Sequence, residues 1–246
     1  ALPPALRDFP LPDLSLAQPD GITQQPEIPV DRVVAILFTS GSTGRPQAQR
    51  KTWGKLVANV EAGAQALGLA HMPQHIVATV PAQHSYGFES SFLPALQAAS
   101  PFWAGKPFYP QDITAALAAV PRPRLLVTTP FHLATLLDAG IDIPALDGIV
   151  SATAPLAPEL AARAEAALGA PLLEIYGSTE SGQLASRRPT QDTAWTLLAG
   201  VRLEDAAGQI LASGRHVEGR VPLGDRIERL ADGRFELLGR HADIIN

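Results

Sequence analysis

The sequence predicts an α/β protein: a largely parallel sheet with flanking helices, followed by a small antiparallel β subdomain. Short apolar and β-branched runs alternate with helical stretches of about 10 to 15 residues up to roughly residue 190, which is the pattern of a parallel sheet. Beyond that point the runs are separated by Gly and Asp turns and contain no helical stretch, which indicates antiparallel strands. The chain of 246 residues is long enough for one large domain or two modest ones.

Several runs are expected to be strands, because each is short, apolar and followed by a loop signal of Ser, Thr, Gly or Pro. They are VVAILF (33–38), HIVATV (75–80), RLLVTTP (124–130), GIVSATAP (148–155) and PLLEIYGSTES (171–181). The first of these runs is expected to be a buried strand that leads into a loop.

The stretches between these strands carry helix signals. In KTWGKLVANVEAGAQALGL (51–69), apolar side chains recur on one helical face, and Thr52 is expected to be the N-cap. The apolar face consists of Trp53, Leu56, Val57, Val60, Ala64 and Leu67. Further helices are expected within 90–100, 111–120, 131–140 and 158–168, the last of them ended by Gly169.

The pattern also predicts how the chain is divided. Residues 1–30 are rich in proline and are expected to form an irregular N-terminal arm. Residues 31–195 are expected to form the α/β portion, and residues 196–240 the small β subdomain.

Composition limits the classes of function. The formal net charge of −5 does not favour binding to a nucleic-acid backbone. The absence of cysteine excludes disulfides and thiolate metal sites. The first residues, ALPPALRDFP, lack the basic and apolar regions of a signal peptide, and no apolar stretch approaches the ~20 residues of a membrane helix. A cytoplasmic location without a membrane span is therefore expected.

The stretch LFTSGSTGRPQ (37–47) is rich in Ser, Thr and Gly and follows an apolar run, which is typical of a phosphate-binding loop. A Walker-type loop needs lysine after its last glycine, whereas Gly44 is followed here by Arg45 and Pro46. The spacing of GSTG also differs from the dinucleotide-binding fingerprint. From these residues alone, a surface turn is an open alternative.

Further motifs follow in order along the chain: SATAPL (151–156), IYGSTE (175–180), and LGD (223–225) with GRHADII (239–245). Together with TSGSTGRP they resemble the signature motifs of the adenylate-forming (AMP-binding) superfamily. This superfamily contains acyl- and aryl-CoA synthetases, the adenylation domains of peptide synthetases and luciferase-like enzymes. The resemblance covers roughly residues 33 to 245.

The resemblance implies a two-step reaction. A carboxylic acid, fatty or aryl, is activated by ATP and Mg²⁺ as an acyl-AMP with release of pyrophosphate, and the acyl group then passes to the thiol of CoA or of a phosphopantetheine carrier protein. The first loop would close over the β and γ phosphates of ATP. Its residues are Thr39, Ser40, Gly41, Ser42, Thr43 and Gly44. The family usually has lysine at the position of Gln47, and Arg45, Arg50 and Lys51 are other cations nearby in the chain.

The motif IYGSTE supplies the candidate catalytic residues. By resemblance, Tyr176 stacks on adenine and Gly177 lines the same nucleotide site. Thr179 contacts the α-phosphate, and Glu180 helps to hold Mg²⁺. The chemistry suits Glu180, because a hard cation prefers carboxylate oxygen and water as ligands.

Two other motifs complete the nucleotide site. Asp225 matches a carboxylate that accepts hydrogen bonds from both ribose hydroxyls, and Arg240 matches an arginine that contacts ribose or phosphate. Ala154 and Pro155 match the segment that borders the adenine. Just before them, Ala152 and Thr153 stand where the family has glycines.

The stretch VPAQHSYGF (80–88) resembles the region that forms the acid pocket. His84 would lie beside the acyl carboxylate and act as a gate, with Gly87, Phe88 and Ser178 lining the pocket. The other histidines show no metal-ligand spacing and are interpreted as structural or surface residues. They are His71, His75, His132, His216 and His241.

Comparison with the family pattern predicts that the chain is the core of a large N-terminal domain. The beginning of that domain and the small C-terminal domain, which carries the lysine that bridges carboxylate and α-phosphate, are expected to be missing, and residues 241–246 would be the hinge to the latter. Two interpretations of the chain are left open: a fragment of a larger enzyme, and a shortened paralogue. Other functions left open are a non-catalytic nucleotide- or adenylate-binding module, an amino-acid adenylation domain and, least favoured by the motifs, a Walker-type kinase or ATPase.

Overall fold

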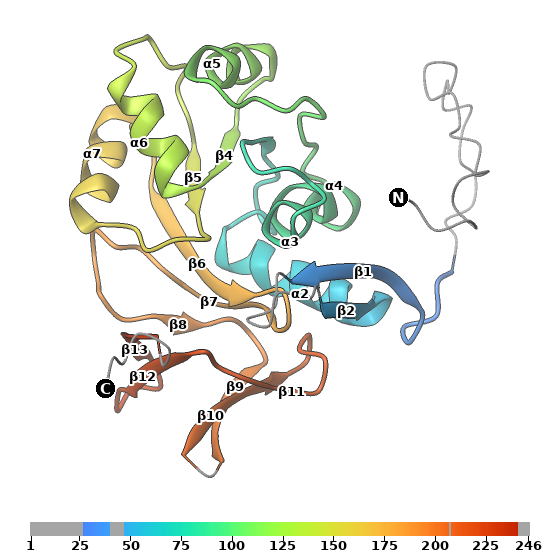
Figure 1. The fold of residues 1–246 in the computed structure, drawn as a ribbon. Coiled ribbons are helices and arrows are strands. Elements are labelled where there is room, and N and C mark those ends of the chain that lie inside the picture. Colours follow the sequence, from blue (N-terminus) through green and yellow to red (C-terminus); the bar gives the residue numbers. More distant parts are fainter. Residues whose placement is uncertain (1–26, 40–46, 207, 241–246) are drawn as a thin grey trace.

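The computed structural model describes residues 27–39, 47–206 and 208–240 (Figure 1). Its central feature is a six-stranded sheet with the order β3-β4-β5-β6-β7-β8, in which β3 to β6 are parallel and β7 and β8 are antiparallel to their neighbours. The strands are β3 (His75–Ala78), β4 (Arg124–Thr128), β5 (Gly148–Ser151), β6 (Leu172–Ser178), β7 (Gly182–Arg187) and β8 (Thr196–Leu197). The predicted α/β class with a largely parallel sheet is confirmed.

Helices cover both faces of this sheet. The helices α5 (Pro110–Ala119), α6 (Pro130–Asp138) and α7 (Pro158–Leu168) pack on one face. Helix α2 (Trp53–Ala66) and the short α3 (Ser85–Gly87) pack on the other. Because both faces are buried, the parallel strands read as continuous apolar runs in the sequence.

Successive side chains of a strand pack against opposite helix layers. On β4, Leu126 belongs to the cluster under α5–α7, while Leu125 and Val127 belong to the cluster under α2 and α3. This alternation follows from the period of two residues in a strand. Each of α5, α6 and α7 begins with proline in its first turn, and Gly169 ends α7 in the left-handed conformation at φ 65°.

The expectation that VVAILF is a buried strand is wrong. Strand β1 (Val33–Thr39) pairs antiparallel with β2 (Gln47–Thr52) in a separate two-stranded hairpin, and the side chains of β1 alternate between half-buried and exposed. Phe38 is 66% exposed. An apolar run shows that a strand is present, but not whether both of its faces are covered.

One helix boundary agrees with the expectation and one differs from it. Helix α2 begins at Trp53, and Thr52 has the extended backbone of an N-cap, but its hydroxyl donates to Glu218 Oε1 (2.7 Å) and makes no capping bond. The helix expected within 90–100 begins earlier, since α3 continues into the π-helical turn η2 (Phe88–Phe92) and α4 (Leu93–Gln97).

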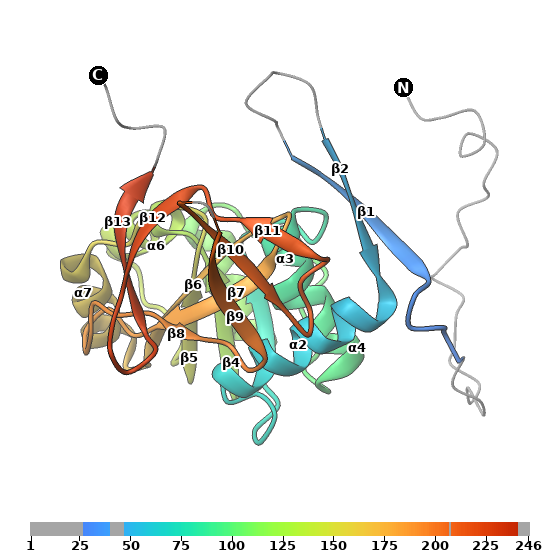
Figure 2. The same cartoon turned by 90° about the horizontal axis from the view of Figure 1, so that it is seen from below.

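The last part of the described chain is antiparallel, as expected. Three strands pair in the order β11-β10-β9, and β12 pairs with β13. They are β9 (Val201–Ala206), β10 (Gln209–Gly214), β11 (Arg220–Pro222), β12 (Asp225–Arg229) and β13 (Phe235–Arg240). Figure 2 shows these strands beside the edge of the main sheet. Their apolar side chains form one cluster with α2, β7 and Trp195. The division of the chain at residues 195 and 240 stays a prediction.

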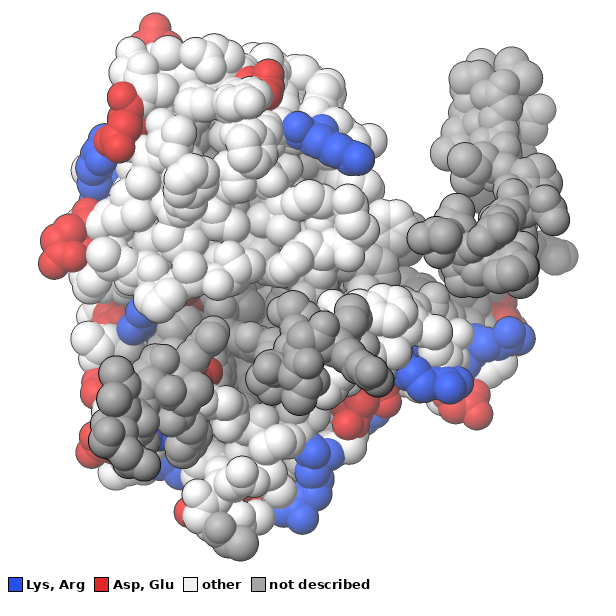
Figure 3. All heavy atoms as spheres, viewed as in Figure 1, with Lys and Arg blue, Asp and Glu red and all other residues white. Residues whose placement is uncertain are grey.

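Over the described residues of the face seen in Figure 3, Lys and Arg side chains are interspersed with Asp and Glu. Among the helices of the described ranges, none is both long and apolar enough to cross a membrane.

Candidate active site: three adjoining pockets

Three pockets meet at Thr153, which lines each of them. Thr153 follows β5, and its φ of 79° lies in the left-handed region, which is unfavourable for a β-branched residue. The pockets therefore lie at the carboxyl ends of the parallel strands, where α/β sheets usually bind ligands. Backbone strain at such a junction is a feature of functional sites.

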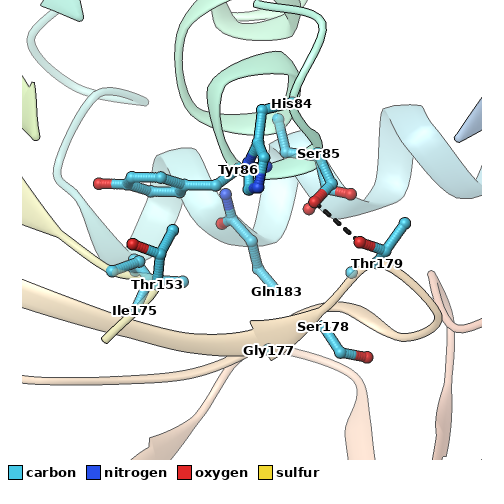
Figure 4. A pocket seen from close by; sticks show the side chains of 12 residues that line it. His84, Ser85, Tyr86, Thr153, Ile175, Gly177, Ser178, Thr179 and Gln183 are labelled. Carbon is cyan, nitrogen blue, oxygen red and sulfur yellow. Dashed lines mark hydrogen bonds between the residues drawn. The ribbon is translucent and has the colours of Figure 1, made fainter. Parts of the chain in front are cut away.

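The first pocket, of about 220 Å³, lies between α3 and the end of β6 (Figure 4). His84 and Ser85 line it from one side, and Ser178 and Thr179 from the other. The hydroxyls of Ser85 and Thr179 are hydrogen-bonded across the pocket at 3.0 Å. The structure thus brings together His84, Ser178 and Thr179, which the sequence placed in two separate motifs.

His84 caps α3. Its Nδ1 accepts a hydrogen bond from the backbone N–H of Tyr86 at 3.3 Å. Because Nδ1 is the acceptor, this contact assigns the proton of the neutral imidazole to Nε2. The ring is therefore held as a donor at Nε2.

Tyr86 also lines this pocket, a position that sequence reasoning missed. The side chain is 7% exposed, and its hydroxyl lies 3.1 Å from the carbonyl oxygen of Thr128 and 3.0 Å from that of Val150. Burial raises the pKa of Tyr86, so the phenol stays neutral and donates to these carbonyls. The two acceptors belong to different strands, which fixes the ring in place.

The expectation that Gly87 and Phe88 line the acid pocket stays a prediction. Neither residue is among those that line the first pocket. A Cβ on Gly87 would lie 2.3 Å from the carbonyl oxygen of Pro81. The glycine therefore allows the backbone of α3 to pack closely against that of Pro81. Phe88 stacks on Phe92 at 5.6 Å and packs against the apolar cluster between α2 and α4.

The second pocket, of about 490 Å³, lies on the other side of His84 and Thr153. Its lining is mainly apolar and includes Trp103 and Phe108. Phe108 packs edge-on against the ring of His132 at 5.0 Å, so His132 lies at this pocket. The sequence placed the stretch 80–88, part of which lines this pocket, at the acid pocket, but it gave Trp103, Phe108 and His132 no role there.

The third pocket, of about 470 Å³, is lined by Ala154, Pro155, Tyr176, Gly177 and Asp225. These are the described residues that the sequence assigned to a nucleotide, apart from Thr39, Thr179 and Arg240. Tyr176 donates from Oη to Asp225 Oδ2 at 2.8 Å. The ring of Tyr176 also packs against Trp195 and Phe235, with centroids 5.6 and 5.8 Å away.

Gly177 is required by the backbone at this pocket. It sits at a register shift between β6 and β7, and a Cβ there would lie 2.2 Å from the carbonyl oxygen of Gly182. No side chain fits at that distance. The bulge sets the direction of the residues that follow, including Thr179.

A buried ion pair supports the wall of the third pocket. Glu174 Oε2 accepts from Arg187 Nε at 2.8 Å, Oε1 accepts from the backbone of Leu156 at 3.1 Å, and the Arg187 guanidinium lies 4.5 Å from the Trp195 ring centroid. Burial raises the pKa of Glu174, and the Arg187 charge opposes that shift. This support was not predicted from the sequence.

Glu180 lies in the turn between β6 and β7 and is half-buried. Among the described residues, no group of three or more His, Cys, Asp or Glu side chains is arranged as a metal site. A single carboxylate nevertheless fits Mg²⁺ in a nucleotide site, since this ion commonly takes one or two protein carboxylates together with phosphates and water.

Part of the expected phosphate loop lies outside the described residues. Ser40, Gly41, Ser42, Thr43 and Gly44 belong to the segment 40–46. Thr39 ends β1 and is paired with Gln47, which begins β2. The backbone of Arg240 is paired with Asp225 at the end of the β12–β13 ladder, next to the third pocket.

The aromatic, acid-bearing third pocket and the smaller first pocket both lie at the strand ends of the α/β sheet, which is where proteins of this fold class usually bind ligands. The chain belongs to the family of AMP-binding enzymes, whose family model matches residues 5–221.

The relatives in sequence are CoA ligases. The chain is 32% identical over 213 residues to a 4-coumarate–CoA ligase of Rhodobacter capsulatus, covering 84% of this chain and 51% of the relative. It is 37% identical over 160 residues to one of Halorhodospira halophila, covering 63% and 38%. An indoleacetate–CoA ligase of Aromatoleum aromaticum is 27% identical over 173 residues, covering 68% and 33%. The chain thus spans about half the length, or less, of these relatives.

Solved structures share the fold. ATP-bound MatB from Rhodopseudomonas palustris superposes with a TM-score of 0.74 at 22% identity, covering 89% of this chain and 50% of that one. O-succinylbenzoate coenzyme A synthetase (MenE) from Bacillus subtilis, in complex with ATP and magnesium ion, superposes with a TM-score of 0.76 at 19% identity, covering 90% and 54%.

Proposed function

We propose that the protein activates a carboxylic acid with ATP and transfers the acyl group to a thiol. The observation that carries this proposal is the junction of the first and third pockets, because Thr153, Ile175 and Gly177 line both. A carboxylate in the first pocket and an α-phosphate at the edge of the third would be neighbours. Holding two reactants next to each other in this way is a large part of the catalysis that a bimolecular step needs.

The proposed first step is attack of a carboxylate oxygen on the α-phosphorus of ATP. The new bond is the acyl–phosphate bond, and the bond to the pyrophosphate oxygen breaks. In the second step the sulfur of a thiolate attacks the acyl carbon, and AMP leaves with the electrons of the acyl–oxygen bond. Mg²⁺, when bound, would neutralise phosphate charge, and Glu180 is its proposed protein ligand.

Named residues take the remaining roles. Thr179 donates to the α-phosphate, and its contact with Ser85 fixes the hydroxyl at the pocket junction. His84, with its proton on Nε2, donates to the acid carboxylate and separates the first pocket from the second. Asp225 accepts from the ribose hydroxyls while Tyr176 packs against adenine and orients that carboxylate.

An aryl acid is the proposed substrate class. The first pocket is small, about 220 Å³, and the fixed ring of Tyr86 lies in its wall. The relatives are by name ligases of 4-coumarate and of indoleacetate. A compact acid with a flat ring suits both observations, whereas a long fatty acid needs a deeper channel.

A pyrophosphate-exchange assay tests this proposal with aryl, fatty and amino acids of matched concentration. Exchange with aryl acids supports it, exchange only with fatty or amino acids overturns the substrate class, and exchange with none overturns the enzymatic function. CoA and a phosphopantetheine-loaded carrier protein are then compared as acceptors of the pre-formed acyl-AMP. We propose CoA, since the relatives are CoA ligases by name.

A non-catalytic adenylate-binding module is the second candidate. It is favoured by Gln47, which stands where the family usually has a lysine near the phosphates. This candidate predicts calorimetric binding of an acyl-AMP mimic without pyrophosphate exchange.

A further inference from the structure

Lys51 is a buried cation in a strand that is otherwise largely exposed. In β2, Gln47, Ala48 and Arg50 are exposed, whereas Lys51 is 4% exposed. Lysine is almost never fully buried unless its charge has partners. The position of Lys51 therefore needs an explanation.

The partners come from distant parts of the chain. Lys51 Nζ donates to the backbone carbonyl of Glu180 at 3.1 Å, over a sequence separation of 129 residues. Burial lowers the pKa of Lys51, and the carboxylates of Glu89, Glu218 and Glu180 oppose that shift. Glu89 lies in η2 and is itself 5% exposed, while Glu218 accepts from the backbone N–H of Thr52, next to Lys51. Lys51 thus links the hairpin to the β6–β7 turn by a hydrogen bond, and the carboxylates of Glu89 and Glu218 favour its charge.

The carbonyl that Lys51 contacts belongs to the turn that carries Thr179 and Glu180. Within this turn, Ser178 and Ser181 bond to each other, which shapes it locally. These local bonds do not fix the turn relative to the pockets. Lys51 contacts the turn from the hairpin side, and Ser85 contacts Thr179 from the side of α3.

We propose that Lys51 is a positioning residue for ATP: by holding the Glu180 carbonyl, it keeps the Thr179–Glu180 turn in place to meet the phosphates. The role rests on the proposed function. Lys51 does not touch the reacting atoms in this account. It acts through the turn, so its loss affects ligands with phosphates more than the nucleoside, which contacts Tyr176 and Asp225.

The test compares four proteins: wild type, Lys51→Met, the double variant Lys51→Met/Glu89→Met, and Lys55→Met as the matched control. Lys55 also donates to distant backbone carbonyls, those of Gly214 at 3.3 Å and Arg215 at 2.9 Å, but it lies away from the turn. The double variant replaces both buried ionisable side chains, Lys51 and Glu89. Removing only one of two buried charges is strongly destabilising, whereas replacing both with apolar side chains often is not. The double variant separates the positioning role from a loss of folding.

The measurements are hydrogen exchange of the turn in the nucleotide-free protein, and calorimetric affinity for Mg·ATP and for adenosine. Both Lys51 variants are expected to exchange at least about tenfold faster in the turn and to bind Mg·ATP about tenfold more weakly, with adenosine affinity within about twofold of wild type. Lys55→Met is expected to match wild type in all three measurements.

If the turn of the double variant exchanged as slowly as in wild type and the variant bound Mg·ATP as tightly as wild type, Lys51 would have no positioning role. An equal loss of affinity for Mg·ATP and for adenosine would also overturn that role. A wild-type protein that binds neither ligand would overturn the proposed function. In that case the exchange rates still decide whether Lys51 holds the turn, and unchanged rates reject that role too.

Discussion

Tyr176 Oη donates to Asp225 Oδ2 across 2.8 Å and so links β6 of the main sheet to β12 of the antiparallel part. Both residues line the third pocket. The hydrogen bond holds an acidic acceptor beside an aromatic ring, which is the combination that a ribose and an adenine require. The relationship joins residues 49 positions apart and is the basis of the first prediction.

Tyr176→Phe is expected to weaken AMP binding about fivefold, because the ring remains but the Asp225 carboxylate loses the bond that orients it. Calorimetry with AMP measures the effect. Tyr109→Phe is the matched control, since Tyr109 is 65% exposed and does not line the third pocket. An affinity for the Tyr176 variant equal to that of the control would contradict the role of this bond.

Thr153 gives a prediction about stability. Thr153→Gly is expected to be more stable than Thr153→Ala by about 1 kcal/mol, because glycine adopts a positive φ without the Cβ penalty that alanine retains. Urea unfolding of the two variants gives the difference in the free energy of unfolding. If alanine were as stable as glycine, the left-handed backbone at the junction of the pockets would not be strained.

Glu89 gives a pH dependence. Burial raises its pKa from 4.5 to about 7, and the Lys51 charge opposes the shift. Since the folded-state pKa lies above the unfolded value, the protonated form stabilises the fold, and this contribution is fully present below pH 4.5 and lost as the pH rises through about 7.

Wild type is therefore expected to lose more unfolding free energy than Glu89→Gln between about pH 5 and about pH 8, by an amount on the order of 2 kcal/mol. Urea unfolding of both proteins at the two pH values measures it, and the other titrating groups cancel in the comparison. Parallel pH profiles would show that Glu89 does not titrate in this range.

The pair of Glu174 and Arg187 gives a prediction about the wall of the third pocket. Glu174→Ala is expected to destabilise the protein by about 3 kcal/mol, because it removes the buried carboxylate that pairs with Arg187 and leaves the Leu156 N–H without its acceptor, although Arg187 still donates to the Thr193 carbonyl. Asp138→Ala, which breaks an exposed pair with Arg163, is expected to change stability by less than about 0.5 kcal/mol. Thermal and urea unfolding compare them, and similar losses in both would contradict the account.

The sheet and the residues at its strand ends follow from local sequence. Thr153 and Thr179 come directly after short apolar runs, and parallel strands bring such positions to one edge, so their proximity was predictable. The hairpin of β1 and β2 was not, because the run VVAILF carries no information on which of its faces is covered.

The supporting contacts also escaped prediction. The burial of Lys51 depends on Glu89 and Glu218, which reach it only through the tertiary fold. Tyr86 is fixed by backbone carbonyls of two strands, and no pattern in its own segment indicates them. Side chains that act through distant partners need the three-dimensional arrangement.

In the proposed function, the third pocket takes the nucleotide and the first pocket takes the acyl group of one acyl-adenylate. Calorimetry with a non-hydrolysable aryl-AMP mimic, on wild type and on Asp225→Asn, is the decisive measurement. Wild type is expected to bind the mimic, and the variant to bind it at least about tenfold more weakly, because a charged acceptor for the ribose hydroxyls is lost. Absence of binding to wild type, or equal affinities of the two proteins, would contradict this assignment of the two pockets.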